Sequence, residues 1–81
     1  MRPQTPLPLT FEEHAQLGQE LRRTRLRMHE LSAVVVEIYG PQNRSAFTLQ
    51  KIAEALDRLC ADLETQAAAD LPGQSVDRLY L

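Results

Sequence analysis

The densest group of side chains able to do chemistry is a set of arginines in the first half of the chain. Four of the nine basic residues lie within six positions: Arg22, Arg23, Arg25 and Arg27. Arginines gathered in this way could contact phosphates, which would indicate an RNA or DNA ligand. However, the four positions spread around a helix, and no aromatic side chains lie between them to stack on bases. We therefore expect a solvated helix face that pairs with acidic residues, and we keep nucleic-acid binding as the alternative.

The two histidines are the candidates for metal binding or acid–base chemistry. His14 and His29 are 15 residues apart, which is about 22 Å along one helix, so they cannot share a site within one chain. Ala33 stands where a zinc-binding His-Glu-x-x-His motif would place its second histidine. His14 is predicted to be a partly buried polar residue that bonds to Asp70. We expect no metal ion, no cofactor and no catalytic residue.

Composition narrows the class of protein. Cys60 is the only cysteine, so an intrachain disulfide and a multi-cysteine metal site are excluded, and we interpret it as a small buried hydrophobe. The net charge of −2 provides no basic excess to attract nucleic acid or an anionic membrane. The longest apolar run, residues 33–36, is far shorter than the roughly 18 residues of a membrane span. A cytoplasmic, non-enzymatic protein is the expectation.

Two helices must position these side chains, and the first is delimited by capping signals. Residues 1–10 are predicted to be an extended lead-in because their prolines forbid regular helix. Thr10 is the expected N-cap, and Glu13 completes a capping box three residues later. Gly40 provides a C-terminal stop, so the first helix is predicted to span residues 11–39.

The second helix follows a short turn. Ser45 is its expected N-cap, and the helix is predicted to cover residues 46–69. The helical hairpin therefore forms one domain over residues 11–70, followed by a C-terminal tail over residues 71–81. The tail can either pack on the hairpin or remain free, and the sequence leaves both options open.

Apolar residues recur in heptad steps on both predicted helices. The two rows on the first helix are His14, Leu21, Met28 and Val35, and Leu17, Thr24, Leu31 and Ile38. The predicted seam of the second helix is Leu49, Ile52, Leu56, Leu59 and Leu63, flanked by the small residues Ala53, Cys60 and Ala67. Antiparallel packing brings the apolar positions together and places His14 near Asp70. The predicted fold class is therefore an all-α antiparallel helical hairpin.

The predicted hairpin has a thin core, and small scaffolds of this kind usually need a staple or a partner. Near the turn the first helix is apolar nearly all round, so one neighbouring helix covers only part of it. The candidate dimer interface comprises Val34, Val36, Ile38, Tyr39 and Phe47. We predict a homodimeric four-helix bundle, with the two turns at opposite ends favoured over the same end. The alternative is that the tail of the same chain covers the turn.

In outline, this architecture resembles small dimeric helical-hairpin proteins, including plasmid RNA regulators. The resemblance concerns the two-helix pattern and carries no functional residue to this chain, since fold alone does not determine function. The expected function is an oligomerising protein–protein interaction, adaptor or regulatory module without a small-molecule substrate. The alternative is a nucleic-acid-binding regulator that uses the arginine cluster.

Overall fold

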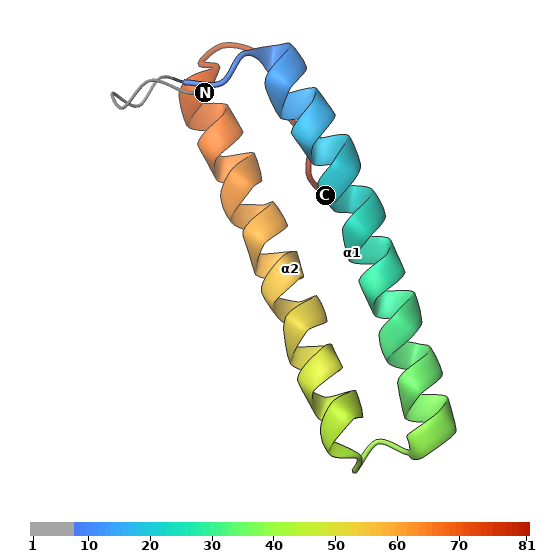
Figure 1. The fold of residues 1–81 in the computed structure, drawn as a ribbon. Helices are drawn as coiled ribbons and strands as arrows, with labels where there is room; N and C mark the ends of the chain where they lie inside the picture. Colours follow the sequence, from blue (N-terminus) through green and yellow to red (C-terminus); the bar gives the residue numbers. More distant parts are fainter. Residues whose placement is uncertain (1–7) are drawn as a thin grey trace, which may run out of the picture.

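The computed structural model describes residues 8–81 as two long antiparallel helices followed by a tail that folds back on them. Helix α1 spans Phe11–Tyr39 and helix α2 spans Arg44–Asp70. The helices lie side by side and are joined by a tight turn at one end (Figure 1). The predicted all-helical hairpin is confirmed. Most of the predicted lead-in, residues 1–7, lies outside the described residues.

Local capping determines both ends of α1. The Thr10 hydroxyl accepts a hydrogen bond from the Glu13 N–H at 3.2 Å, and the Glu13 carboxylate accepts one from the Thr10 N–H at 2.9 Å. The predicted capping box is therefore confirmed. At the C-terminal end of α1, Gly40 has φ 88°, a backbone conformation that residues other than glycine rarely adopt. The predicted bounds of the first helix agree with the structure.

The start of α2 differs from the prediction. The N-cap is Asn43, whose side-chain oxygen accepts hydrogen bonds from the N–H groups of Ser45 (2.9 Å) and Ala46 (3.2 Å). The prediction of Ser45 as N-cap is wrong, because Asn43, two residues earlier, satisfies two otherwise unpaired amides. The helix then begins at Arg44 and ends at Asp70, where the Leu71 N–H donates to the Ala67 carbonyl.

The seam between the helices combines one predicted row with a row of small side chains. Leu21, Met28 and Val35 are half-buried, as expected of a seam. The second predicted row is wrong, because its members are largely left outside: Leu17, Thr24 and Ile38 are exposed and Leu31 is half-buried. In their place α1 buries Gly18 and Ser32, and α2 buries Ala46, Ala53, Cys60 and Ala67.

Small side chains explain this choice of row. The separation of two packed helices depends on the side chains between them, so a row of alanine, glycine and serine allows close approach. The larger Ile52 and Leu59, which we predicted in the seam, then lie on its flank and remain exposed. The seam buries little apolar surface for its length as a result.

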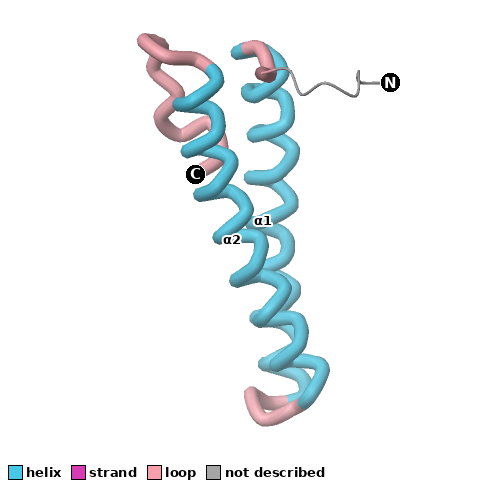
Figure 2. Tube along the Cα trace, turned by 90° about the vertical axis from the view of Figure 1, so that its left-hand side faces the viewer, coloured by secondary structure: helices cyan, strands magenta, loops and turns pink. Residues whose placement is uncertain are grey.

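The tail, residues 71–81, lies against one side of the hairpin at the end away from the turn (Figures 1 and 2). We call this the terminal end, and we call the side that carries the tail the tail face. A buried hydrophobic cluster lies here and contains Cys60, Ala67, Val76 and Tyr80. Four partly buried leucines pack against it: Leu21, Leu63, Leu71 and Leu79. The tail therefore supplies a third layer, but only at the terminal end.

Candidate functional site

A buried chain of polar side chains ties the tail to both helices. His14 on α1 and Tyr80 in the tail have no exposed surface. His14 Nδ1 lies 2.7 Å from the Tyr80 hydroxyl, and His14 Nε2 lies 2.8 Å from Asp70 Oδ2. With a neutral imidazole, Nε2–H donates to the carboxylate and Nδ1 accepts from the hydroxyl, so both ring nitrogens have partners. The predicted bond between His14 and Asp70 is confirmed.

Asp70 collects further donors at the end of α2. Its carboxylate accepts hydrogen bonds from the Gln66 side-chain amide at 2.9 Å and from the Leu9 N–H at 3.3 Å. The hydrogen bond from His14 is the largest cause that holds the pKa of Asp70 below its ordinary value, followed by the bond from Gln66. At the other end of this series of hydrogen-bonded side chains, burial raises the pKa of Tyr80. An ionised carboxylate and a neutral phenol are therefore the stable forms of these two groups.

Gly18 makes room for the backbone of the tail. It is buried on α1, and a methyl group at this position would overlap the carbonyl of Leu79. On the other side, the Tyr80 N–H donates to Glu64 of α2 at 3.3 Å. The tail backbone is thus held between α1 and α2, and no residue larger than glycine fits at position 18 without moving it.

The Asp70–His14–Tyr80 chain has the order of groups in which a carboxylate orients an imidazole for proton transfer. Catalysis would also require a reacting molecule within hydrogen-bond reach of the imidazole or the hydroxyl. Both rings are fully buried, and both nitrogens of His14 are already engaged. The chain therefore acts as a structural connection between the tail and the helices.

Cys60 is also inaccessible. It is fully buried in the cluster beneath the tail, and burial raises the pKa of its thiol. A raised pKa leaves little of the nucleophilic thiolate at neutral pH. This agrees with the prediction of a small buried residue.

The arginine cluster does not form one charged patch. Arg25 lies at the edge of the seam, where its Nε donates to Asp57 Oδ1 at 2.8 Å, and His29 bonds to the same carboxylate at 2.9 Å. These contacts, with the His29 bond the largest, hold the pKa of Asp57 below its ordinary value. Arg27 pairs with Glu30 at 3.7 Å. The predicted pairing with acidic residues is therefore confirmed for Arg25 and Arg27.

The other two arginines remain in solvent. Arg22 and Arg23 are exposed and have no ion-pair partner among residues 8–81. A shallow hollow is lined by Arg22, Arg25, Leu26 and His29. Since Arg25 and His29 already bond to Asp57, Arg22 is the one lining residue with an uncommitted charge for a phosphate. This part of the structure does not favour the nucleic-acid alternative.

On the side opposite the tail, the hairpin presents a row of large apolar side chains to solvent. We call this the apolar face, and its members are Leu17, Leu31, Val34, Ile38, Ile52 and Leu59. All except the half-buried Leu31 are between 38% and 65% exposed. The contacts of His29 with Asp57 and of Tyr80 with Glu64 lie on the other flank of the seam. The rows at Leu17 and Ile52 therefore share the uncovered side.

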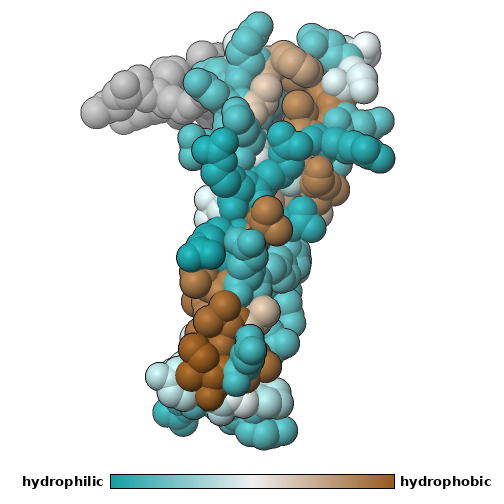
Figure 3. Space-filling model, turned by 90° about the vertical axis from the view of Figure 1, so that its right-hand side faces the viewer, coloured by the Kyte–Doolittle hydropathy of each residue, from teal (hydrophilic) through white to brown (hydrophobic). Residues whose placement is uncertain are grey.

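The predicted interface residues lie at the turn end, and most of them are exposed. Ile38, Tyr39 and Phe47 are more than half exposed, Val34 is slightly less so, and Val36 is half-buried. Figure 3 shows a hydrophobic patch over the turn end of α1. The alternative that the tail covers the turn is wrong, because the Tyr80 anchor holds the tail at the terminal end.

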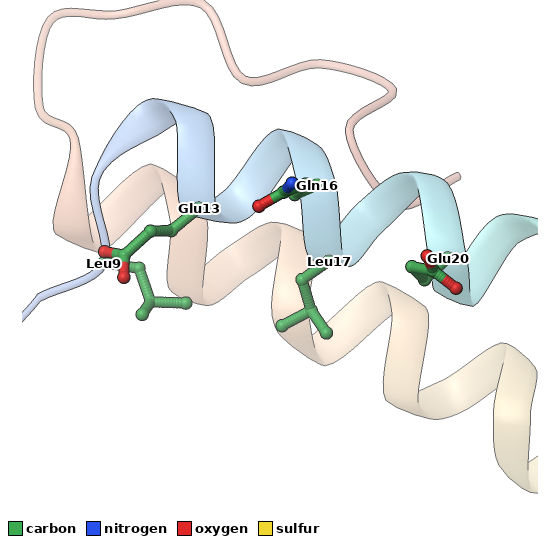
Figure 4. A pocket seen from close by; sticks show the side chains of 5 residues that line it. All are labelled: Leu9, Glu13, Gln16, Leu17 and Glu20. Atoms are coloured by element: carbon green, nitrogen blue, oxygen red, sulfur yellow. The ribbon is translucent and has the colours of Figure 1, made fainter. Parts of the chain in front are cut away.

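A hollow extends the apolar face to the terminal end. It is lined by Leu9, Glu13, Gln16, Leu17 and Glu20 (Figure 4). The side chains of Leu9 and Leu17 extend in the same direction.

Two classes of site lack support in the part of the chain that the structure describes. Across residues 8–81, no group of histidine, cysteine, aspartate and glutamate side chains is arranged to hold a metal ion. Neither α1 nor α2 is long and apolar enough to cross a membrane. Comparison of the chain with protein-family models, with curated proteins and with solved structures finds no match.

Sequence reasoning missed the two residues that anchor the tail. The sequence analysis assigns no role to Tyr80 or to Gly18. A signal for both existed: a histidine on a seam needs two hydrogen-bond partners, and Asp70 supplies one. A tyrosine in a flexible segment after the helix is a candidate for the second.

Proposed function

We propose that this chain is a non-enzymatic interaction module that binds a second copy of itself through the apolar face, forming a four-helix bundle. The contrast between its core and its surface supports the proposal. Among residues 8–81 the buried apolar side chains are Ala46, Ala53, Cys60, Ala67, Val76 and Tyr80, most of which are small. The large aliphatic side chains of the apolar face remain in contact with water. A partner that covers them completes the core.

The size of the apolar face makes it the decisive surface for association. Full burial of a large aliphatic side chain contributes about 1.5–3 kcal/mol, so covering half of each contributes on the order of 1 kcal/mol apiece. A dimer that covers both copies gains about 12 kcal/mol, against an association cost of about 4–15 kcal/mol. Because the gain and the cost are comparable, one charge placed on the apolar face is expected to prevent association.

Twofold symmetry supports a second copy as the occupant. A twofold axis brings identical surfaces together, so the apolar rows of one hairpin meet the same rows of the other. We propose that the turns lie at opposite ends. This arrangement directs Val34 and Ile38 of one copy towards the hollow between Leu9 and Leu17 of the other. Each hairpin would then cover the turn-end patch of its partner.

The non-enzymatic part of the proposal is supported by the positions of the reactive groups. His14 and Cys60 are the side chains best suited to acid–base or nucleophilic chemistry, and both are fully buried. His29 is accessible, but it bonds to Asp57. No substrate can approach the first two without displacement of the tail.

Sedimentation equilibrium at micromolar concentration tests the proposal. We expect twice the chain mass for the wild-type protein and one chain mass for the double variant Ile52→Lys, Leu59→Lys. Both positions are already solvent-exposed, so far-UV circular dichroism should show the same helix content. Leu26→Lys is the matched control, because Leu26 is 63% exposed and lies on the opposite flank, beside His29. A folded wild-type monomer, or a double variant that remains a dimer, would contradict the proposal.

A further inference from the structure

We propose that the tail is an intramolecular latch that limits association to the apolar face by covering a second apolar surface on the tail face. This inference rests on the proposed self-association and concerns its regulation. With the tail in place, a hairpin has one large apolar face and closes as a dimer. With the tail displaced, a hairpin has two such faces and binds further copies.

The surface under the tail is apolar and continuous with the seam. Val76 and Tyr80 of the tail form one buried cluster with Cys60 and Ala67 of α2, and the partly buried Leu21 and Leu63 pack against this cluster. The last four of these residues belong to the helices and lie at the terminal end. Without the tail, apolar side chains of this area would gain exposed surface beside His14 and Glu64, which bond to Tyr80. A surface of this kind on both sides of a flat hairpin permits open-ended association.

Few contacts hold the latch closed. The anchors within the tail are Val76 and Tyr80, which are buried, and Leu71 and Leu79, which are partly buried. Between and beside them, residues 72–75 and 77–78 are exposed. Arg78 has φ 65°, a left-handed conformation that strains a residue with a side chain. A segment with few anchors and a strained residue can separate from the helices while these stay paired.

The single cysteine reports on the latch. Cys60 is fully buried in one cluster with Val76 and Tyr80 of the tail, so displacement of the tail removes part of what shields the thiol from a reagent. The rate of Cys60 modification by an aromatic disulfide reagent therefore measures tail opening, and sedimentation velocity on unmodified protein measures association. The two readouts are independent of one another.

Gly18→Ala is the main test variant. The added methyl would overlap the Leu79 carbonyl, while alanine favours the α1 helix more than glycine does. Tyr80→Ala is the second variant, since it removes the anchor without changing either helix. Gln19→Ala is the matched control, because Gln19 neighbours Gly18 and is exposed. We expect Cys60 to react at least tenfold faster in both test variants, and both to sediment as species larger than the wild-type protein.

Each other outcome has a definite meaning. Faster modification of Cys60 with unchanged mass would overturn the latch, because the exposed surface would then not bind another copy. Unchanged modification in both variants would overturn it as well, because these contacts would not hold the tail. Loss of helix content in both would show that the tail is required for folding and is not a latch. If the wild-type protein is a monomer, the apolar-face dimer fails, whereas a mass increase in Gly18→Ala would still support the latch.

Discussion

Replacement of Tyr80 by phenylalanine tests the buried hydrogen-bond chain with the smallest available change. The variant keeps the ring that meets His14 edge-on, with ring centres 5.8 Å apart, and removes only the hydroxyl. His14 Nδ1, which lies 2.7 Å from that hydroxyl, then loses its partner inside a fully buried ring. An unsatisfied buried polar atom costs about 1–3 kcal/mol. We therefore expect the free energy of unfolding to fall by about 2 kcal/mol.

Urea unfolding monitored by far-UV circular dichroism measures this loss, with all variants at one protein concentration so that association contributes equally. In a thermal scan the same loss corresponds to a decrease in Tm of about 8–16 °C for a domain of this size. Tyr39→Phe is the matched control, because Tyr39 is 66% exposed and a surface substitution changes stability by about 0.5 kcal/mol or less. Equal stabilities of the two variants would refute a contribution of the buried hydroxyl.

Three further predictions follow from the caps and the titrating groups. Because hydrogen bonds lower the pKa of Asp70 from 3.8, its contribution to stability is present above pH 3.8 and is lost as the pH falls through the lowered value. Asp70→Asn should therefore be less stable than the wild-type protein at pH 6, and it should lose less stability on acidification. Midpoints of urea unfolding measure both effects. An acid dependence equal to that of the wild-type protein would contradict a role of the Asp70 carboxylate. The variant Tyr39→Phe leaves Tyr80 as the single tyrosine, and burial raises the pKa of Tyr80 above 10. The contribution of the neutral phenol to stability is therefore lost as the pH rises beyond 10. In this variant the midpoint of tyrosinate absorbance should lie above pH 10. Asn43→Ala should cost about 1 kcal/mol and Ser45→Ala much less in urea unfolding, and the reverse order would restore Ser45 as the cap.

Local signals in the sequence were sufficient to predict α1. Thr10, Glu13 and Gly40 delimit the helix because capping depends on residues in its first and last turns and on little else. The antiparallel register was also predictable from the heptad rows, as the contact between His14 and Asp70 confirms. The prediction of Ser45 as N-cap failed because Asn43, two residues earlier, competes for the same unpaired amides.

The choice of seam row was not predictable from periodicity. The row that begins at Leu17 and the row that begins at Gly18 repeat with the same heptad steps, so a periodic pattern identifies a stripe but not which of its edges faces α2. The structure buries Gly18 and Ser32 of the second row, and this leaves Ile38 and Ile52 on the apolar face. The proposed dimer surface is therefore larger than the turn-end patch predicted from sequence.

The sequence by itself determined two capped helices, their antiparallel register and the pairing of His14 with Asp70, because each follows from spacing along one or two helices. Only the tertiary structure decided which row is buried and where the tail lies. The decisive contact joins His14 to Tyr80, 66 residues away, across a notch at Gly18 that exists only after the helices have packed. A contact of that kind depends on the shape of a folded surface, which no local pattern of residues describes.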